Sequence, residues 1–226
     1  MNLPFDRGLF GQLRHDAAGH WRDYVEHPFV RALEDGTLPS AAFRRYLTQD
    51  YLFLIQFARA YALAGYKSAS VADLRAAAAG LGAIVDVEMK LHVAYCADWG
   101  LSEAEMEAEP EAMETIAYTR FVLDRGLAGD LLDLHVALAP CIIGYAEIGE
   151  RLAAQADVAG HPYQAWVAAY AGPEYQAAAL AAVYTLDRLA ASRGSESRYA
   201  ELAATFVTAT RLEAAFWDIG WSLVKR

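Results

Sequence analysis

The chain is dominated by long segments in which apolar residues recur every three or four positions. Clusters of Gly, Pro and Ser interrupt them at few places, for example 36–39, 100–102 and 192–197. This spacing draws one apolar stripe along an α-helix, and the abundant Ala, Leu, Glu and Arg favour helix. Sustained polar/apolar alternation, which indicates strands, is not seen. The pattern predicts an all-α bundle of about seven to eight helices joined by short loops.

Composition limits the partners that we expect. The chain has 226 residues, of which 56% are hydrophobic, enough for one domain spanning 1–226 with a full core. The formal charge of −10, without a basic cluster, argues against nucleic acid and against an anionic membrane surface. We find no apolar run long enough to span a bilayer and no signal-peptide pattern at the N-terminus. With two cysteines, the chain fits a reducing compartment, so we expect it in the cytoplasm.

One carboxylate is predicted to lie on a buried helix face. In the helix expected from about 40 to 66, Asp50 stands three or four positions from apolar residues of the stripe, namely Tyr46, Leu47, Phe53 and Leu54. A buried carboxylate is costly unless it is paired or hydrogen-bonded. Asp50 is therefore either a functional group or a structural one bonded to a neighbouring Tyr or Arg.

A second carboxylate follows the same pattern near the C-terminus. Glu213 shares one helix face with Phe206, Thr210, Phe216, Trp217 and Gly220. Burial in this aromatic setting would raise its pKa and favour a proton donor near neutral pH. The alternative is a surface Glu paired with Arg211 or Lys225.

A thiol lies beside a helix defect. Cys141 follows Pro140, which removes one backbone donor and pushes away the carbonyl of Val136. Asp130 can cap the helix that carries both residues. A buried cysteine is most often inert, as we expect of Cys96, near a helix C-terminus. Bundle helices turn their apolar faces toward one centre, so this thiol and both carboxylates could share one pocket.

Aromatic residues suggest the class of ligand. Tyr118, Tyr145 and Tyr170 lie near helix middles or ends, where ring walls with hydroxyl tips suit a flat heteroaromatic molecule. Because the chain has 13 tyrosines, ordinary core packing is the alternative for each of them.

Several ordered motifs together resemble one family along nearly the whole chain. They are His-Pro-Phe-Val-Arg-Ala-Leu-Glu-Asp-Gly-Thr-Leu-Pro at 27–39, Tyr-Leu-Thr-Gln-Asp-Tyr-Leu-Phe-Leu at 46–54, Ala-Leu-Ala-Pro-Cys at 137–141, and Glu213 with Phe216-Trp217. The chain resembles the TenA family, thiaminase II, of the haem-oxygenase-like helical fold. The resemblance implies hydrolysis of 4-amino-5-aminomethyl-2-methylpyrimidine, and of thiamine in many members, in thiamine salvage. It also implies a homotetramer that needs no metal or organic cofactor.

The resemblance assigns roles to individual residues. It implies that Cys141 is the nucleophile, Glu213 the acid/base and Asp50 the partner of a ring nitrogen. It also implies four substrate-binding residues, which are Tyr118, Tyr145, Tyr170 and Phe53. Phe53 stands where some members have Tyr, so one hydroxyl would be missing while the ring wall remains.

Two other functions stay open. An oxidase or haem-binding protein of the same fold, similar to pyrroloquinoline-quinone synthase, could use His20 or His27. Di-metal sites in helical bundles use Glu-x-x-His pairs, whereas Glu88 and His92 are four positions apart. The second alternative is a non-catalytic pyrimidine-binding or regulatory protein.

Overall fold

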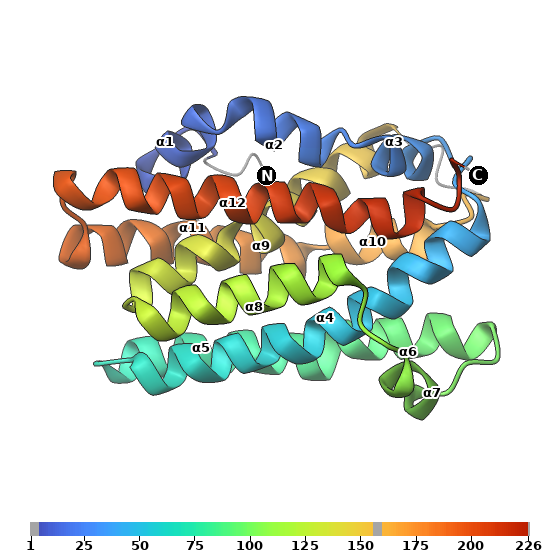
Figure 1. Cartoon of the computed structure of the whole chain (residues 1–226), viewed down its shortest axis with the longest axis horizontal. Coiled ribbons are helices and arrows are strands. Elements are labelled where there is room, and N and C mark those ends of the chain that lie inside the picture. The colour runs from blue at the N-terminus through green and yellow to red at the C-terminus, as the bar shows by residue number, and fades with distance from the viewer. Residues whose placement is uncertain (1–4, 156–159, 226) are drawn as a thin grey trace. The chain divides into compact units, whose positions relative to one another are not determined.

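Every regular element in the described part of the chain is helical. The computed structural model describes residues 5–155 and 160–225 (Figure 1). The predicted all-α fold is confirmed, but these ranges hold twelve α-helices and one π-helical segment, more than the seven or eight expected. Short breaks that leave no strong sequence signal account for the difference. Ala17 alone separates the first two helices, and the π-helical segment divides another long run.

The chain groups into two compact units, each built from two stretches of sequence. Unit 1 comprises 1–38 with 135–217, and unit 2 comprises 39–134 with 218–226. The helices of unit 1 are α1 (Gly8–Asp16), α2 (Ala18–Val25), α3 (Pro28–Glu34), α10 (Gln164–Ala171) and α11 (Pro173–Arg193), with most of α9 (Leu131–Gln155) and α12 (Glu196–Trp221). Those of unit 2 are α4 (Ser40–Lys67), α5 (Val71–Ala83), η1 (Ile84–Glu88), α6 (Met89–Asp98), α7 (Glu103–Ala108) and α8 (Met113–Ala128).

Aromatic rings on α12 hold unit 1 together. The Trp217 ring stacks on Phe29 of α3, with ring centroids 5.1 Å apart, and on Tyr24 of α2, at 6.3 Å. Phe206, near the middle of the same helix, stacks on Trp21 of α2, with ring centroids 5.8 Å apart. Aromatic side chains bury large apolar areas, and offset or edge contacts add to this burial. The helices α2 and α3 therefore pack along one face of α12 through these aromatic contacts.

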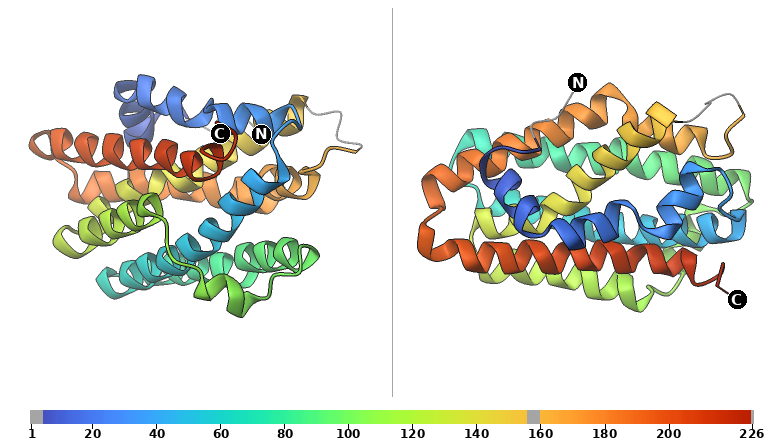
Figure 2. Two further views of the ribbon diagram at one scale, coloured as in Figure 1. Left: turned by 45° about the vertical axis from the view of Figure 1, so that its right-hand side comes forward. Right: turned by 90° about the horizontal axis from the view of Figure 1, so that it is seen from above.

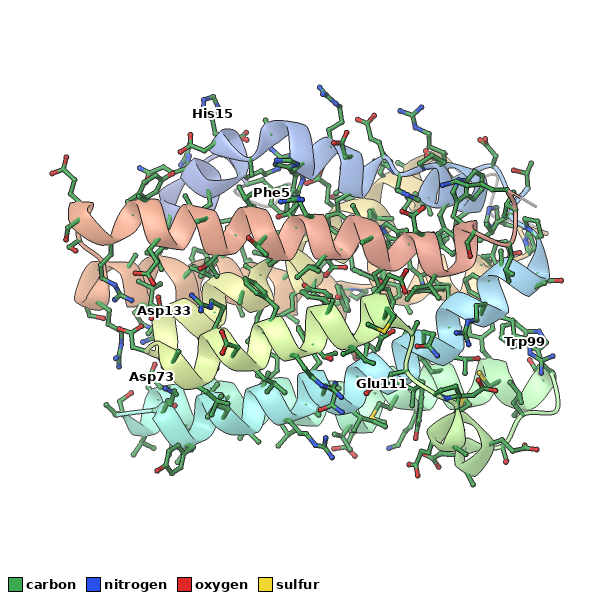
Figure 3. All side chains as sticks on the ribbon, in the orientation of Figure 1. Phe5, His15, Asp73, Trp99, Glu111 and Asp133 are labelled. Atoms are coloured by element: carbon green, nitrogen blue, oxygen red, sulfur yellow. The ribbon has the colours of Figure 1, made fainter. Side chains whose placement is uncertain are left out.

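Helix α9 has the character of a core helix. The stretch Leu131–Ala154 is the one described segment whose length and mean hydropathy of 1.5 would suit a membrane span, but 83% of its apolar window is buried inside the protein. Asp130 caps it as predicted, since its Oδ1 accepts from the backbone N–H of Leu132 at 2.8 Å. The Asp133 carboxylate, labelled in Figure 3, accepts in turn from the N–H of Asp130 at 2.7 Å.

In unit 2 the neighbouring helices pack around α4. This helix contacts α5, α6, α7 and α8, and Figure 2 shows α5 running beside it. Its predicted span of 40–66 matches the observed Ser40–Lys67 closely. Sixteen of its residues are buried, including the polar side chains of Thr48, Gln49 and Asp50. A helix buried to this extent needs partners for its polar groups.

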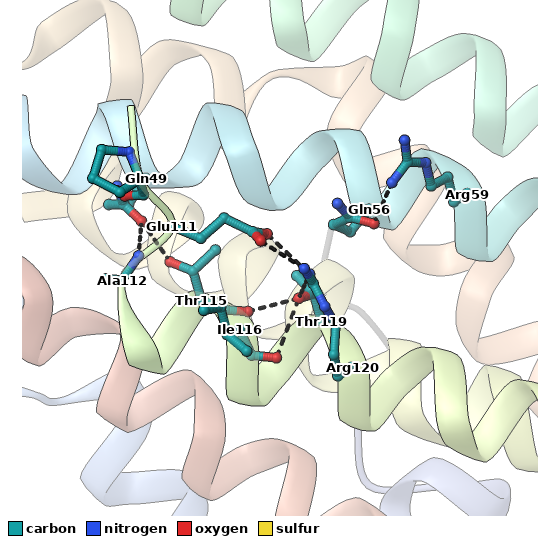
Figure 4. Close-up of polar contacts among 10 residues, drawn as sticks. Gln49, Gln56, Arg59, Glu111, Ala112, Thr115, Ile116, Thr119 and Arg120 are labelled. Carbon is teal, nitrogen blue, oxygen red and sulfur yellow. Dashed lines mark hydrogen bonds and ion pairs between the residues drawn. The ribbon is translucent and has the colours of Figure 1, made fainter. Parts of the chain in front are cut away.

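Gln49 supplies one such link, from α4 to the start of α8 (Figure 4). Its Nε2 donates to the carbonyl of Pro110 at 3.0 Å, while its Oε1 accepts from the N–H of Ala112 at 2.7 Å and from the hydroxyl of Thr115 at 2.9 Å. The side chain is fully buried. Three groups of the 110–115 segment thus depend on one amide.

We expect Gln49→Leu to lower the free energy of unfolding by on the order of 3 kcal/mol, because it leaves the buried Thr115 hydroxyl, the partly buried N–H of Ala112 and one carbonyl without their partner. Urea unfolding followed by circular dichroism measures this loss. Gln56→Leu is the matched control on the same helix, since the Gln56 Oε1 accepts one bond from the exposed Arg59 (Figure 4). Equal losses in both variants would contradict the role given to Gln49.

Candidate functional site

Helix α4 places Asp50 inside unit 2. The side chain is buried, with 4% of the residue exposed, as the position on the apolar stripe predicts. The Tyr46 hydroxyl, one turn earlier on the same helix, donates to the Asp50 Oδ2 at 3.0 Å. The Tyr partner considered at the sequence level is therefore present.

A second partner of Asp50 was not predicted. Nε2 of His92, on α6, lies 2.7 Å from the same Oδ2, and the imidazole is fully buried. Nδ1 of His92 lies 2.9 Å from the backbone carbonyl of Glu88, the last residue of η1. Burial lowers the pKa of His92, but its hydrogen bond with Asp50 and the charges of Asp50 and Glu88 outweigh burial, so its pKa is raised above 6.5.

Two aromatic residues predicted to bind substrate lie together in unit 2. The rings of Phe53 on α4 and Tyr118 on α8 lie 5.1 Å apart, and Phe53 also stacks on Phe57 at 5.0 Å. Both predicted residues are almost fully buried. Unit 2 therefore brings Asp50, Phe53 and Tyr118 onto the helices α4 and α8.

In unit 1 the thiol of Cys141 lies on a helix that continues through its proline. Cys141 is buried, with 8% exposed, and α9 runs from Leu131 to Gln155 across Pro140. The Tyr24 hydroxyl donates to the carbonyl of Pro140 at 3.4 Å. The Tyr24 ring lies against Gly144, where an added Cβ would come within 2.2 Å of a ring carbon. A glycine in mid-helix is thus required for the approach of this ring.

The same helix positions the two tyrosines of unit 1. The rings of Tyr145 and Tyr170 lie 5.0 Å apart. At Gly149 an added Cβ would stand 2.6 Å from the backbone of Tyr170, so α10 packs directly on the α9 backbone. Nε2 of Gln176, on α11, donates to the carbonyls of Ala146 and Tyr170, both at 2.9 Å. Gln176 therefore ties the two ring-bearing segments together.

Glu213 occupies the buried face of α12 that its spacing predicts. Only 1% of the residue is exposed, and Phe206, Thr210, Phe216 and Trp217 are buried with it. The Thr210 hydroxyl bonds back to the carbonyl of Phe206 at 2.8 Å. Trp217, the next turn, packs on Tyr145 with ring centroids 5.2 Å apart. The surface alternative for Glu213 is therefore wrong.

The other cysteine differs from Cys141 in its setting. Cys96 lies near the end of α6, is fully buried, and forms no disulfide. Burial raises the pKa of its thiol to about 11, although Arg44 acts in the opposite direction. A thiol with this pKa stays protonated near neutral pH, which agrees with the inert role expected of it.

The predicted residues divide between the units. Asp50, Phe53 and Tyr118 belong to unit 2, whereas the other four, Cys141, Tyr145, Tyr170 and Glu213, belong to unit 1. Sequence reasoning missed His92 and Gln176, which hold predicted residues in place. The spacing of Glu88 and His92 departs from a metal motif and does not predict the contact between His92 and Asp50. Within residues 5–155 and 160–225 no group of three or more His, Cys, Asp or Glu side chains is arranged to hold a metal.

A separate hollow of about 500 Å³ opens on the surface of unit 1. Its lining includes His15 and Asp16 of α1 with Tyr199 of α12, and Figure 3 shows His15 pointing away from the ribbon. The Tyr199 hydroxyl donates to Asp16 at 2.7 Å. None of the predicted site residues lines this hollow.

The chain is similar in sequence to one protein family along most of its length. Residues 14–222 match the model of the TENA/THI-4/PQQC family. An uncharacterized protein of Haemophilus influenzae is 40% identical over 95% of this chain and 100% of its own. The aminopyrimidine aminohydrolase of Halalkalibacterium halodurans is 37% identical over 89% of this chain and 90% of its own.

Solved structures agree on the fold. A protein of Silicibacter sp. TM1040, described as a TenA family transcription regulator, superposes with a TM-score of 0.92 at 45% identity and covers 97% of this chain and 99% of its own. A domain of unknown function from Shewanella denitrificans, 14% identical, superposes with a TM-score of 0.72 over 95% of this chain and 92% of its own, and is described as having a heme oxygenase-like fold. The predicted fold class is thereby confirmed.

Proposed function

Because this chain belongs to the TENA/THI-4/PQQC family, we propose that it hydrolyses 4-amino-5-aminomethyl-2-methylpyrimidine to the 5-hydroxymethyl compound and ammonia, in the salvage of thiamine. The observation that carries the proposal is the likeness to the aminopyrimidine aminohydrolase of H. halodurans, which extends over nearly the full length of both chains. Thiamine itself, split into the same pyrimidine alcohol and the thiazole, is a second substrate of the same reaction class.

The proposed reaction uses three buried groups in sequence. The Cys141 thiolate adds to the ring carbon next to the aminomethyl group, and Asp50 accepts a hydrogen bond from the protonated ring nitrogen, so that the addition leaves the ring without net charge. Glu213 protonates the amine, which leaves as ammonia. Water then adds to the methylene and gives its proton to the Glu213 carboxylate, and the thiolate leaves as the ring regains its aromatic character. The aromatic side chains Phe53, Tyr118, Tyr145 and Tyr170 hold the flat ring.

A second function is favoured by one comparison. The 45% identical protein of Silicibacter is described as a transcription regulator. A regulator that binds the pyrimidine without chemistry would need the ring walls and Asp50 but no nucleophile. The likeness to an aminopyrimidine aminohydrolase over nearly the full length of both chains supports the enzyme instead.

We expect the purified protein to release ammonia from the aminomethylpyrimidine, and Cys141→Ser to abolish this release while binding persists, because the hydroxyl is a far weaker nucleophile. A coupled ammonia assay and calorimetric titration with the pyrimidine alcohol measure the two properties. Cys96→Ala is the matched control and should keep turnover within about twofold, since the Cys96 thiol stays protonated. Wild-type protein that binds but releases nothing from this substrate or from thiamine would favour the regulator.

Glu213→Gln should slow turnover by about a hundredfold or more, because the amide cannot donate the proton that the leaving amine requires. The substitution keeps the size of the side chain, so the change in kcat reports on the proton. Glu201→Gln, on the exposed face of the same helix, is the control and should leave kcat unchanged. An undiminished kcat in the Glu213 variant would remove this residue from the mechanism.

The same proposal places the protein in the cytoplasm as a homotetramer. Exposed apolar side chains on unit 2 support assembly, since Tyr66, Val71 and Leu127 each expose more than 60% of their surface. Light scattering on the purified protein should give about four times the chain mass of 24.7 kDa. A mass of one chain would contradict the tetramer and leave the catalytic proposal untouched.

A further inference from the structure

The hydrogen bonds around His92 determine where its protons lie. A backbone carbonyl only accepts, so Nδ1, 2.9 Å from the carbonyl of Glu88, must carry a hydrogen. One more proton then lies between Nε2 and the Asp50 Oδ2, 2.7 Å apart. Either the pair is ionised, with imidazolium and carboxylate, or the carboxyl donates to a neutral imidazole. In both states the pair as a whole carries no net charge.

Among the described residues, the two hydrogen bonds that reach Asp50 both fall on one of its oxygens. Oδ2 receives the Tyr46 hydroxyl at 3.0 Å and faces the His92 Nε2, while neither bond involves Oδ1. A carboxylate has four lone-pair sites on two oxygens, so Oδ1 keeps its capacity to accept. Two partners from different helices, Tyr46 on α4 and His92 on α6, hold Oδ2 in place.

We propose that His92 is the positioning residue of Asp50: it holds Oδ2, and so presents Oδ1 as the oxygen that accepts from an N–H of the aminopyrimidine. This inference rests on the proposed function and adds a residue to its site. His92 acts through Asp50 and does not itself touch the ligand. It also balances the charge of a carboxylate that burial would otherwise disfavour.

The charge of His92 gives a test that needs no substrate. The charged groups that act on His92 are Asp50 from α4 and Glu88 from η1. In protein with ¹⁵N-labelled histidine, Nδ1 of His92 should stay protonated at every pH, and its pKa should lie above 6.5. In Asp50→Asn the pKa should fall below 6.5, because burial then acts with less opposition. A bare Nδ1, or a pKa unmoved by Asp50→Asn, would overturn the coupling.

A double-mutant cycle then tests the positioning role. We expect His92→Gln to weaken binding of 4-amino-5-hydroxymethyl-2-methylpyrimidine at least about tenfold, and His92→Leu to weaken it further, because Gln still offers a donor to Oδ2. In the Asp50→Asn background the same substitutions should change binding by less than about twofold, since there is no carboxylate left to orient. His15→Gln, at an exposed site, is the control for loss of a histidine.

The outcomes separate this inference from the proposed function. Equal losses in both backgrounds would make His92 a structural residue and overturn the inference, while an active wild-type enzyme would keep the function. A wild-type protein without activity on either substrate would remove the function, and the histidine spectra would still decide whether Asp50 controls His92. Thermal unfolding of each variant shows whether a loss of binding comes from a loss of fold.

Discussion

Much of the polar structure of unit 2 follows from one buried carboxylate, that of Asp50, which needs hydrogen-bond partners. Asp50 lies on the apolar face of α4, where an unpaired charge would be very costly. Its oxygen Oδ2 is met by Tyr46 from the same helix and by His92 from α6. His92 in turn needs an acceptor for Nδ1, which the last residue of η1 provides. Each of these polar groups is hydrogen-bonded to the next. The helices α4, η1 and α6 are therefore connected by polar contacts as well as by packing.

These hydrogen bonds suggest what the π-helical segment η1 does in the structure. Residues of η1 follow i→i+5 hydrogen bonds, as the Met89 N–H shows by bonding to the carbonyl of Ile84. Such a segment changes the rotation of the residues that follow it relative to a regular helix. His92 stands one turn beyond η1 and is fully buried, with its ring between Glu88 and Asp50. Segments of this type are frequent at functional sites, which agrees with the role proposed for His92.

Much of the fold and part of the site could be predicted from the sequence, because helical periodicity is local. It gave α4 almost to the residue and placed Asp50, Cys141 and Glu213 on buried faces, as observed. Periodicity does not say which residue of another helix meets a buried group. Asp50 and His92 are 42 positions apart, and nothing in either segment marks the pair. The sequence likewise does not show that glycine is required at Gly144 and Gly149, because the requirement comes from a ring or a backbone segment that packs against each of them.

The two cysteines show why burial alone does not make a nucleophile. Burial raises the pKa of the Cys96 thiol to about 11, and this group would need far too much energy to ionise near neutral pH. Cys141 is buried as well, and the proposed reaction gives it a base, because the attacking group is the thiolate. In the proposed reaction the thiol loses one proton and the departing amine gains one. A single carboxylate can therefore serve both steps, and Glu213, in the same unit as Cys141, is the group to which we assign them.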